Sequence, residues 1–409
     1  MNIQTIDRIL KETAYVRMGG SEQELACANY LKAECERLGL EAHLESFDVP
    51  MATIRKAKLF ADGQEIPCKG YLCAGSAKIE APLYYLRAGD PCSLSRCRGK
   101  IVLSDGYLGY WKYQDMLANG AVGFITYDGN ANYADEDIDQ RELRSYVSKG
   151  VKIPGVNINA KSAIEMIKSD VQTVRIELEQ DEYDGKSHNV ICDLPGKTDE
   201  LIVLTAHYDS TSLSTGAYDN MSGCIGLLGI AQAFTRKPHR YGLRLVFCGS
   251  EERGLLGSKA YCIQHEKSLG RVVLNVNLDM IGCIMGNFIA CCTTEEKLVH
   301  FIEYFASIYG FDMKARQGVY SSDSTPFADK GVPAVSFARI APQNTATIHN
   351  SYDTLKVMSA DQLAKDIDFL SAFVGAMAGA RHCPVAREIP ENMKEKLDNY
   401  LLRKRPKDA

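Results

Sequence analysis

Two patterns of hydrophobic and polar positions alternate along this chain, one with the period of a helix and one with the period of a strand. Residues 21–38 place apolar side chains at helical spacing, with Ser21 in the N-cap position and Glu24 completing a capping box. Gly39 follows where a helix usually ends. Residues 41–49 alternate and predict a strand.

Residues 50–186 show short strand-like runs separated by turn signals. These runs are KAKLF, APLYYLRAGD, GKIVLSDG, VGFITYDGN, IPGVNIN and VRIELEQ. Helices are expected at 112–119 and 161–168, and the polar run DEYDGKSH is expected to be a flexible segment. The pattern therefore predicts a separate, small, β-rich domain over residues 50–186.

From residue 187 onward, strands and helices alternate strictly. The predicted strands are HNVICDLP, ELIVLTAHYD, LRLVFCGS, RVVLNVNLDM, NFIACCT and AVSFA, and the predicted helices lie at about 220–234, 255–264, 295–309, 325–329 and 360–377. This alternation predicts an α/β domain, formed by residues 1–49 and 187–385, with helices on both faces of a central sheet. Residues 386–409 carry mixed charges and are interpreted as a charged helical tail.

Composition and charge narrow the functional classes. A net charge of −5 gives no electrostatic case for binding nucleic acid. Because no stretch approaches the ~20 apolar residues of a membrane helix, no membrane partner is expected. Charged residues interrupt the N-terminal segment, which predicts no secretory signal and a cytoplasmic protein. The 14 cysteines fit this location, since many lie inside apolar runs and none forms a CxxC pair.

Polar side chains able to bind a metal follow the ends of the buried strands. His207 and Asp209 follow the apolar run LIVL and, being two residues apart on a strand, face the same side. The others are, in chain order, Asp219 and Asn220 before a helix, Glu251 and Glu252 after a second strand, Asp279 after a third, and His349 with Asp353 on a late loop. In an open α/β sheet, ligands bind beyond the strand ends.

The residue types favour zinc over harder cations. Imidazole suits zinc, whereas calcium and magnesium prefer oxygen ligands alone. One zinc would need only three protein ligands. Two metals about 3.5–4 Å apart, sharing one carboxylate, fit the full set of candidates better: His207, Asp219, Glu252, Asp279 and His349.

The adjacent residues Glu251 and Glu252 can have two different roles at a metal site. Neighbouring residues on an extended segment point in different directions. Glu252 can therefore bind metal while Glu251 faces a metal-bound water, takes its proton and returns it to the leaving amine.

Each of these elements also has an ordinary structural interpretation. Asp219 with Asn220 could be a helix N-cap, and His207 could be a core histidine. Two glutamates at a helix start often only complement the helix dipole, and Asp353 could belong to a turn. We favour the metal site because five candidate ligands of suitable types follow strand ends together.

Five motifs in this chain occur in the order of a known family. AHYDS, GAYDNMSG, SEERGLLGS, NLDMIG and HNSYDTL resemble those of the co-catalytic zinc aminopeptidases of peptidase clan MH, which include bacterial leucyl aminopeptidase and glutamate carboxypeptidase. The resemblance covers about residues 1–46 and 187–380. It implies a mixed central sheet of the zinc-peptidase, phosphorylase/hydrolase-like type, and it is specific for the family but not for the substrate.

The resemblance also implies two Zn²⁺ ions per chain and a role for each site residue. His207, Asp219 and Asp279 would hold one ion, and Asp219, Glu252 and His349 would hold the other. Glu251 would be the general base and later the general acid. Asp209 would orient His207, and the peptide bond between Asp219 and Asn220 is cis in many relatives.

The region 50–186 resembles a protease-associated (PA) domain inserted into the peptidase, on GKIVLSDG, NGAVGFITYDGN and IPGVNIN. In relatives such inserts cap the active-site cleft. The chain departs from the family at 322–324, where Ser-Asp-Ser stands for the Ser-Asp-His of many relatives, which puts the pocket shape in question. Tyr320 is a candidate for holding the oxyanion.

The implied reaction is hydrolysis of a peptide bond by a water that bridges the metals. Met280 and Ile348 resemble the walls of an apolar side-chain pocket, with core packing as the alternative. Such a pocket favours Leu or Met at the N-terminus of a peptide substrate, so an aminopeptidase is expected. The chain could also form a homo-oligomer.

Three other functions stay open. A carboxypeptidase or dipeptidase would need a basic pocket, for which Arg316, Lys330 and Arg339 are available in the late loops. A glutaminyl cyclase would usually bind one zinc. A non-catalytic, metal-free binding protein would be expected to have lost the ligands that are present here.

Overall fold

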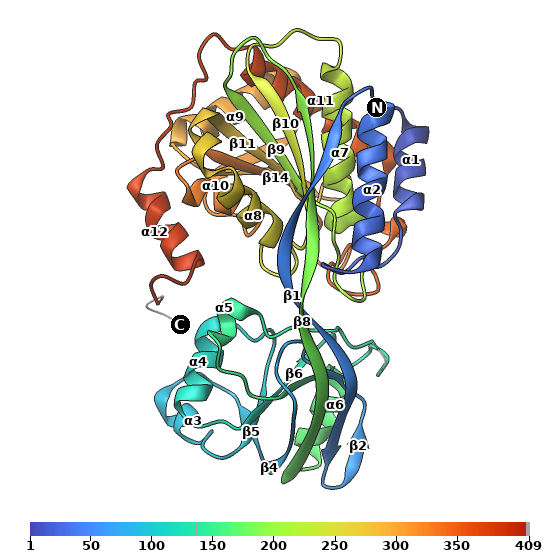
Figure 1. Cartoon of the computed structure of the whole chain (residues 1–409), viewed down its shortest axis with the longest axis vertical. Helices are drawn as coiled ribbons and strands as arrows, with labels where there is room; N and C mark the ends of the chain where they lie inside the picture. The colour runs from blue at the N-terminus through green and yellow to red at the C-terminus, as the bar shows by residue number, and fades with distance from the viewer. Residues whose placement is uncertain (136, 406–409) are drawn as a thin grey trace. The chain divides into compact units, whose positions relative to one another are not determined.

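The chain forms two units that are joined through long strands. The computed structural model describes residues 1–135 and 137–405. Residues 1–47 and 186–404 form one unit, called here the main unit, and residues 48–185 with Arg405 form the inserted unit. The chain passes between them within β1 (Ala42–Ala61) and β8 (Thr173–Leu194) (Figure 1).

These two strands are longer than the sequence pattern predicts. β8 is continuous through DEYDGKSH, so the prediction of a flexible segment between two separate strands is wrong. Likewise, the runs predicted at 41–49 and at KAKLF belong to the single strand β1. β1 and β8 pair with each other, and this ladder satisfies backbone groups of a polar stretch that has no hydrophobic pattern.

The main unit contains a mixed α/β sheet in the order β13-β12-β14-β11-β9-β10-β8. Its other strands are β9 (Leu201–His207), β10 (Gly242–Cys248), β11 (Val272–Leu278), β12 (Asn287–Thr293), β13 (Met313–Gln317) and β14 (Ala334–Ile340). β10, β9, β11 and β14 run parallel, whereas β8 pairs antiparallel with β10, and β12 pairs antiparallel with β14 but parallel with β13. The predicted mixed sheet is therefore confirmed.

Helices cover both faces of this sheet, as predicted (Figure 1). They are α1 (Ile3–Glu12), α2 (Glu22–Arg37), α7 (Ser222–Phe234), α8 (Leu256–Gln264), α9 (Glu296–Tyr309), α10 (Ser324–Asp329), α11 (Ala360–Gly379) and α12 (Glu391–Tyr400), with short turns η1 (Ala217–Met221), η2 (Glu266–Arg271) and η3 (Leu355–Val357). In β10, Leu245 and Phe247 pack into the core that includes α2, α7 and α11. Val246 and Cys248 pack into a second core with α8. This alternation is the strand period that the sequence shows.

The N-terminal region differs in two ways from its prediction. Helix α1 was not predicted, although its buried Ile6, Ile9 and Leu10 follow helical spacing. Helix α2 is confirmed with Ser21 as its N-cap. However, the capping box is wrong, because the Glu24 carboxylate accepts from the Gly20 N–H and from residues outside the helix.

The inserted unit has its own sheet and core. Its strand order is β8-β4-β5-β6-β7-β3, and β2 pairs with β1. The elements are β2 (Gln64–Ile66), β3 (Lys69–Gly70), β4 (Ala77–Leu86), β5 (Ile101–Ser104), β6 (Gly123–Asp128), β7 (Gly155–Asn159), α3 (Pro91–Ser95), α4 (Tyr110–Ala118), α5 (Ser145–Ser148) and α6 (Ala160–Lys168). Its identity as a PA domain stays a prediction.

The C-terminal segment is helical and packs on the main unit. Ile389, Met393 and Leu397 form a small buried cluster with Ala328 of α10. Residues 406–409 of the predicted tail lie outside the described residues. Among the described residues, no helix is both long and apolar enough to cross a membrane.

Candidate metal centre

The candidate site lies where three parallel strands of the main unit end. β9 ends at His207, and Asp279 directly follows β11. Glu251 and Glu252 follow β10 after a short turn. Because β9 pairs in parallel with both β10 and β11, the carboxyl ends of these strands meet at one edge of the sheet, where α/β sheets bind ligands.

The structure brings together all five candidate ligands. Within each of two groups, one ligand atom per residue lies within 4.8 Å of the others. The first group is His207, Asp219 and Asp279, and the second is Asp219, Glu252 and His349. Asp219, which lies in η1, belongs to both groups.

Asp219 stands between the two imidazoles. Its Oδ1 lies 3.0 Å from His207 Nε2, and its Oδ2 lies 3.1 Å from His349 Nε2. His349 Nε2 is also 3.1 Å from Glu252 Oε1, and His207 Nε2 is 3.7 Å from Asp279 Oδ1. Ligand atoms bind zinc at roughly 2.0–2.2 Å, so atoms at these separations can surround a common ion.

The electrostatics of the cluster favour added positive charge. Burial alone would lower the pKa of His207, but Glu251 raises it well above its usual value. Burial would also lower the pKa of His349, whereas Glu252 and Asp219 raise it to about 12. The carboxylates thus attract protons to groups that are normally neutral at pH 7, which is the electrostatic condition for binding a cation.

Asp209 connects the first imidazole to the glutamate pair. It is fully buried, and its Oδ1 lies 3.4 Å from His207 Nδ1. Its two oxygens also accept the backbone N–H groups of Glu251 and Glu252, at 2.9 and 3.1 Å. The two N–H bonds hold the turn after β10, and the carboxylate lies beside His207 Nδ1 without a hydrogen bond to it.

Two further residues hold the segment around Asp219, and the sequence pattern did not assign them this role. Asp353 is fully buried, and its carboxylate accepts from the backbone N–H groups of Tyr218 and Asp219, at 2.9 and 3.2 Å. Asn220 donates to the Leu278 carbonyl at 2.9 Å. Its side-chain oxygen also accepts from the Gly223 N–H at 3.0 Å in the first turn of α7, whose N-cap residue is Met221.

The candidate base lies beside the ligands. Glu251 Oε2 is 3.9 Å from His207 Nε2. Burial raises the pKa of the Glu251 carboxyl well above its usual value, and the neighbouring Glu252 adds to this effect against the influence of His207. The peptide bond between Asp219 and Asn220 is cis.

The candidate pocket residues lie on segments next to the ligands. Met280 has a left-handed backbone (φ +64°) and is half-buried, as are Tyr320 and Ile348. Burial first, and then Asp279, raise the pKa of the Tyr320 hydroxyl. Met280 and Ile348 pack against the main core, so the structure gives both of them a packing role.

The segment that departs from the family pattern is built into the interior. The hydroxyls of Ser322 and Ser324 bond to each other and to Ser336, at 2.8 to 3.1 Å. Asp323 is buried and accepts from the Ser258 hydroxyl at 2.5 Å. Ser324 therefore takes part in a buried hydroxyl cluster.

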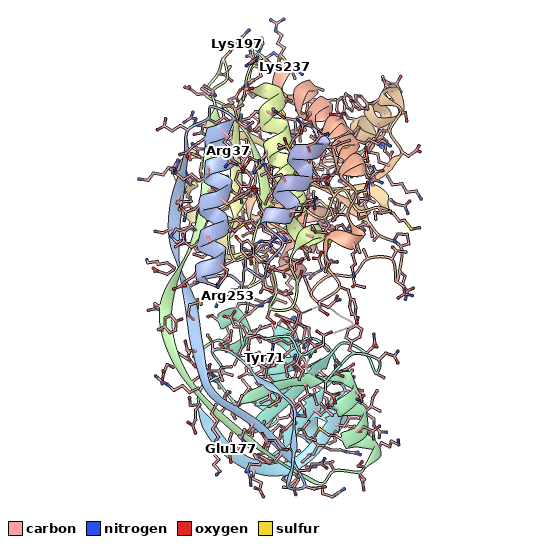
Figure 2. The ribbon with its side chains drawn as sticks, turned by 90° about the vertical axis from the view of Figure 1, so that its right-hand side faces the viewer. Arg37, Tyr71, Glu177, Lys197, Lys237 and Arg253 are labelled. Atoms are coloured by element: carbon pink, nitrogen blue, oxygen red, sulfur yellow. The ribbon has the colours of Figure 1, made fainter. Side chains whose placement is uncertain are left out.

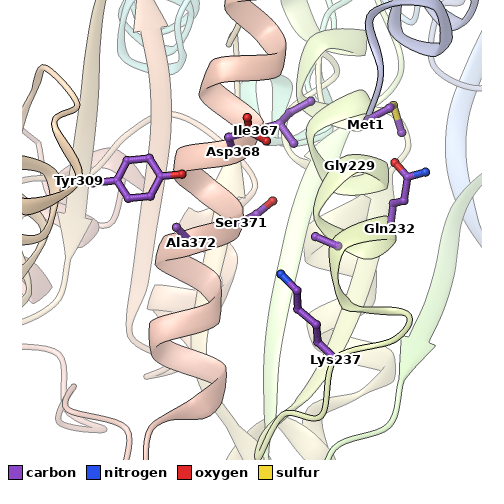
Figure 3. A pocket seen from close by; sticks show the side chains of 10 residues that line it. Met1, Gly229, Gln232, Lys237, Tyr309, Ile367, Asp368, Ser371 and Ala372 are labelled. Carbon is purple, nitrogen blue, oxygen red and sulfur yellow. The ribbon is translucent and has the colours of Figure 1, made fainter.

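A second hollow in the main unit has a different character. A groove of about 350 Å³ lies between α7 and α11 (Figure 3). Lys237, Asp368 and Ser371 are among its lining residues, which include one carboxylate and no imidazole or thiol. It shares no lining residue with the ligand cluster, which remains the stronger candidate for a catalytic site.

The known proteins to which this chain is similar are peptidases. The profile of Peptidase family M28 matches residues 189–374. The aminopeptidase YwaD of Bacillus subtilis is 26% identical and covers 89% of this chain and 82% of its own length. A probable leucine aminopeptidase 2 of Aspergillus fumigatus is also 26% identical, but the chain spans only 54% of it. The solved structure of BSAP, a zinc aminopeptidase from Bacillus subtilis, superposes with a TM-score of 0.77 at 26% identity, covering 96% of this chain and 97% of BSAP.

Proposed function

We propose that this chain, whose residues 189–374 match the model of peptidase family M28, is a zinc-dependent aminopeptidase that removes N-terminal, preferably apolar, residues from peptides. The observation that carries the proposal is the position of Asp219. Its two oxygens face different imidazoles, at 3.0 and 3.1 Å, as a carboxylate shared by two ions would. The similarity to YwaD and BSAP supports both zinc and the aminopeptidase class.

The proposed cofactor is a pair of Zn²⁺ ions. His207, Asp219 and Asp279 would hold one, and Asp219, Glu252 and His349 the other, in accordance with the two ligand groups. When bound, zinc supplies Lewis acidity that polarises a carbonyl group and makes water a stronger acid. The donor set fits this ion because it combines imidazole nitrogen with carboxylate oxygen.

Glu251 is the proposed general base and acid. Its carboxyl lies next to the ligand cluster without belonging to either ligand group. From this position a carboxylate can accept a proton from the attacking water and pass it to the leaving amine. Asp209 is proposed to keep this geometry, since it accepts from the backbone N–H of Glu251 and lies 3.4 Å from His207 Nδ1.

Tyr320, Met280 and Ile348 are proposed to contact the substrate. The electrostatic influence of Asp279 and Asp219 on the Tyr320 hydroxyl supports a place near the reacting carbonyl, where a hydroxyl could stabilise the developing negative charge. Met280 and Ile348 would supply apolar surface to the N-terminal side chain.

Two of the three candidate residues for the carboxypeptidase alternative are already paired with carboxylates of this chain. Arg339 forms a two-pronged contact with the buried carboxylate of Asp366, at 2.9 and 2.5 Å. A guanidinium already paired in this way is a poor site for a substrate carboxylate. Lys330 pairs with Glu266 at 2.7 Å, which leaves Arg316 as the remaining candidate for that alternative.

A matched pair of substrates tests the proposed activity. Leucyl-p-nitroanilide should be hydrolysed, whereas the same compound with an acetylated amine should not. A chelator should abolish hydrolysis, and Zn²⁺ should restore it. Equal hydrolysis of both compounds would contradict an aminopeptidase, and cleavage of an N-blocked dipeptide would favour the carboxypeptidase. Purified protein without zinc would favour a binding protein.

Other properties stay proposals. The thiol-rich composition, with 14 cysteines, supports a cytoplasmic location, because such an environment keeps thiols reduced. The resemblance of the inserted unit to a PA domain supports a role in limiting substrate size. A peptide is the expected partner, and a homo-oligomer remains a prediction for size-exclusion chromatography with light scattering to test.

A further inference from the structure

Two buried ionisable residues connect the N-terminal segment 13–24 to the backbone around the metal centre. Arg17 and Glu24 are 0% and 1% exposed. Burying such groups is costly unless they are fully hydrogen-bonded. The hydrogen-bond partners of the two side chains therefore indicate what each of them holds in place.

Arg17 holds the loop between the candidate ligands His207 and Asp219. Its guanidinium donates to the carbonyl groups of Tyr208, Thr215 and Gly216, the last at 2.8 Å. Its own backbone exchanges hydrogen bonds with Ser210, at 3.1 and 3.2 Å. Further donations to the Thr13 and Tyr15 carbonyls keep the guanidinium in place. The loop from 208 to 216, which runs from His207 towards Asp219, is thus fixed at both ends by one side chain.

Glu24 holds the turn that carries the glutamate pair. Its Oε1 accepts from the backbone N–H and the hydroxyl of Ser250, at 2.8 and 3.0 Å, and from the Ser187 hydroxyl at 2.9 Å. Ser250 has a left-handed backbone (φ +53°), a conformation that costs free energy for a non-glycine residue. Its N–H bond to Glu24 stabilises this turn immediately before Glu251.

The approach of segment 13–24 to the site depends on small residues. A Cβ atom on Gly19 would lie 2.5 Å from Ser250 Oγ, and one on Gly216 would lie 2.6 Å from Arg17 Nη2. Arg253, the residue after Glu252, donates to the Gly19 carbonyl at 3.2 Å. The segment therefore touches the site from both sides of Glu251.

We propose that Arg17 and Glu24 are positioning residues of the metal centre. Arg17 sets the position of Asp209 and Asp219 through the loop between them, and Glu24 sets the direction of Glu251 through Ser250. The inference rests on the proposed function. It gives the N-terminal helix region a role in the reaction beyond covering the sheet.

Helix α2 offers a matched control. Glu34 is also a buried carboxylate of α2 (5% exposed), but it pairs with Arg8 and Arg37 at the surface side of the helix. Glu24→Gln and Glu34→Gln therefore replace one buried carboxyl group each in the same helix. Arg17→Lys and Arg8→Lys form a second pair, which remains informative where one glutamate variant folds poorly.

The experiment measures kcat and KM for leucyl-p-nitroanilide, and the Zn²⁺ affinity of the metal-stripped full chain by competition with a chelating dye. Loss of an outer partner of a metal ligand usually costs about 10- to 100-fold in metal affinity or activity. Glu24→Gln should lower kcat by about this factor with KM within about twofold. Arg17→Lys should weaken Zn²⁺ binding by a similar factor, whereas Glu34→Gln and Arg8→Lys should change neither quantity and lower only the melting temperature.

The outcomes separate this inference from the proposed function. If both test variants match their controls in kcat and in Zn²⁺ affinity, the positioning role is overturned while the peptidase assignment stands. If wild-type protein binds Zn²⁺ but cleaves no peptide, the proposed function fails, and the affinity comparison still decides the role of Arg17. A fall in melting temperature alone, equal in test and control variants, would also overturn the inference.

Discussion

Both units of this protein place polar residues in the interior near the ends of parallel strands. The two clusters differ in the groups that pair with their carboxylates. In the inserted unit, Thr126 and Asn157 bond to each other at 2.8 Å, and Asn157 donates to Asp128 at 3.1 Å. Arg141 lies 3.4 Å from the same carboxylate, and the Tyr71 hydroxyl bonds to Thr126 (Tyr71 is labelled in Figure 2). This network contains its own cation.

In the main unit, the corresponding cluster pairs its carboxylates with imidazoles. The ion pairs of Asp219 and Asp279 are with His207 and His349 rather than with lysine or arginine. Imidazole is neutral at pH 7 unless its surroundings force a proton onto it. The comparison shows that polar residues at strand ends are not sufficient to indicate a metal site, and that carboxylates paired with imidazoles are the distinguishing property.

The largest expected effect comes from the shared ligand. Asp219→Asn should remove bound zinc and lower kcat/KM by more than the roughly 10²–10⁴-fold that loss of a general base alone costs, because both ions lose a ligand. Asp128→Asn is the counterpart in the inserted unit. It should leave kcat within about twofold and lower stability by about 1–3 kcal/mol. Assays with leucyl-p-nitroanilide and thermal unfolding measure both effects, and equal loss of activity in the two variants would break the comparison.

A smaller effect is expected for the base. Glu251→Gln should lower kcat by about 10²–10⁴-fold, because the amide cannot take the proton from water. The zinc content should stay at the wild-type value, since Glu251 belongs to neither ligand group. Steady-state kinetics together with elemental analysis check this prediction. Retention of wild-type kcat would exclude Glu251 as the base.

A still smaller loss of activity is expected for Asp353, which supports the backbone at Asp219. Asp353→Asn keeps the shape of the side chain but weakens its acceptance from the N–H groups of Tyr218 and Asp219. Activity should fall by about 10- to 100-fold, as is usual for such supporting partners. The measurement is kcat at saturating zinc. A variant indistinguishable from wild type would mean that the loop holds Asp219 without this carboxylate.

The smallest effect concerns pH and the inserted unit. Hydrogen bonds from Lys56 and Lys78 lower the pKa of Glu177, which is labelled in Figure 2, to about 2. A carboxylate with a depressed pKa contributes stability that is present above its unfolded pKa of about 4.3 and is lost as pH falls towards about 2. The stability difference between wild type and Glu177→Gln should therefore be present at pH 6 and shrink below about pH 4.

Urea unfolding at several pH values tests this dependence. Glu179→Gln is the control, because Glu179 is on the same strand but 64% exposed and 4.0 Å from Lys56. The midpoint for Glu179→Gln should follow wild type throughout. A difference for Glu177→Gln that persists unchanged to pH 3 would contradict the assignment.

The ligand cluster was accessible to sequence reasoning because residue type and strand position carry the information. His207 and Asp279 follow apolar runs that can only be buried strands, and parallel strands bring their ends together. The identity of the catalytic region follows from these few positions. The mixed α/β sheet could be predicted for the same reason, since its strands are nearly continuous apolar runs.

The remaining parts depend on partners that are distant in the sequence. Glu24 has the spacing of a capping-box residue, and only its contact with Ser250 shows that its carboxylate points inward. Asp353 resembles a turn residue until the N–H groups that it accepts from are located. The polar run inside β8 has no strand period in its sequence. It is a strand because it pairs with β1. Such features are set by tertiary contacts rather than by local pattern.

The central claim, that Asp219 is shared by two zinc ions, is tested most directly by anomalous diffraction at the zinc edge from crystals of the full chain. The account predicts two peaks about 3.5–4 Å apart, one beside His207 and Asp279 and the other beside Glu252 and His349, with Asp219 between them. A single peak, or two peaks that leave Asp219 bound to only one ion, would contradict it.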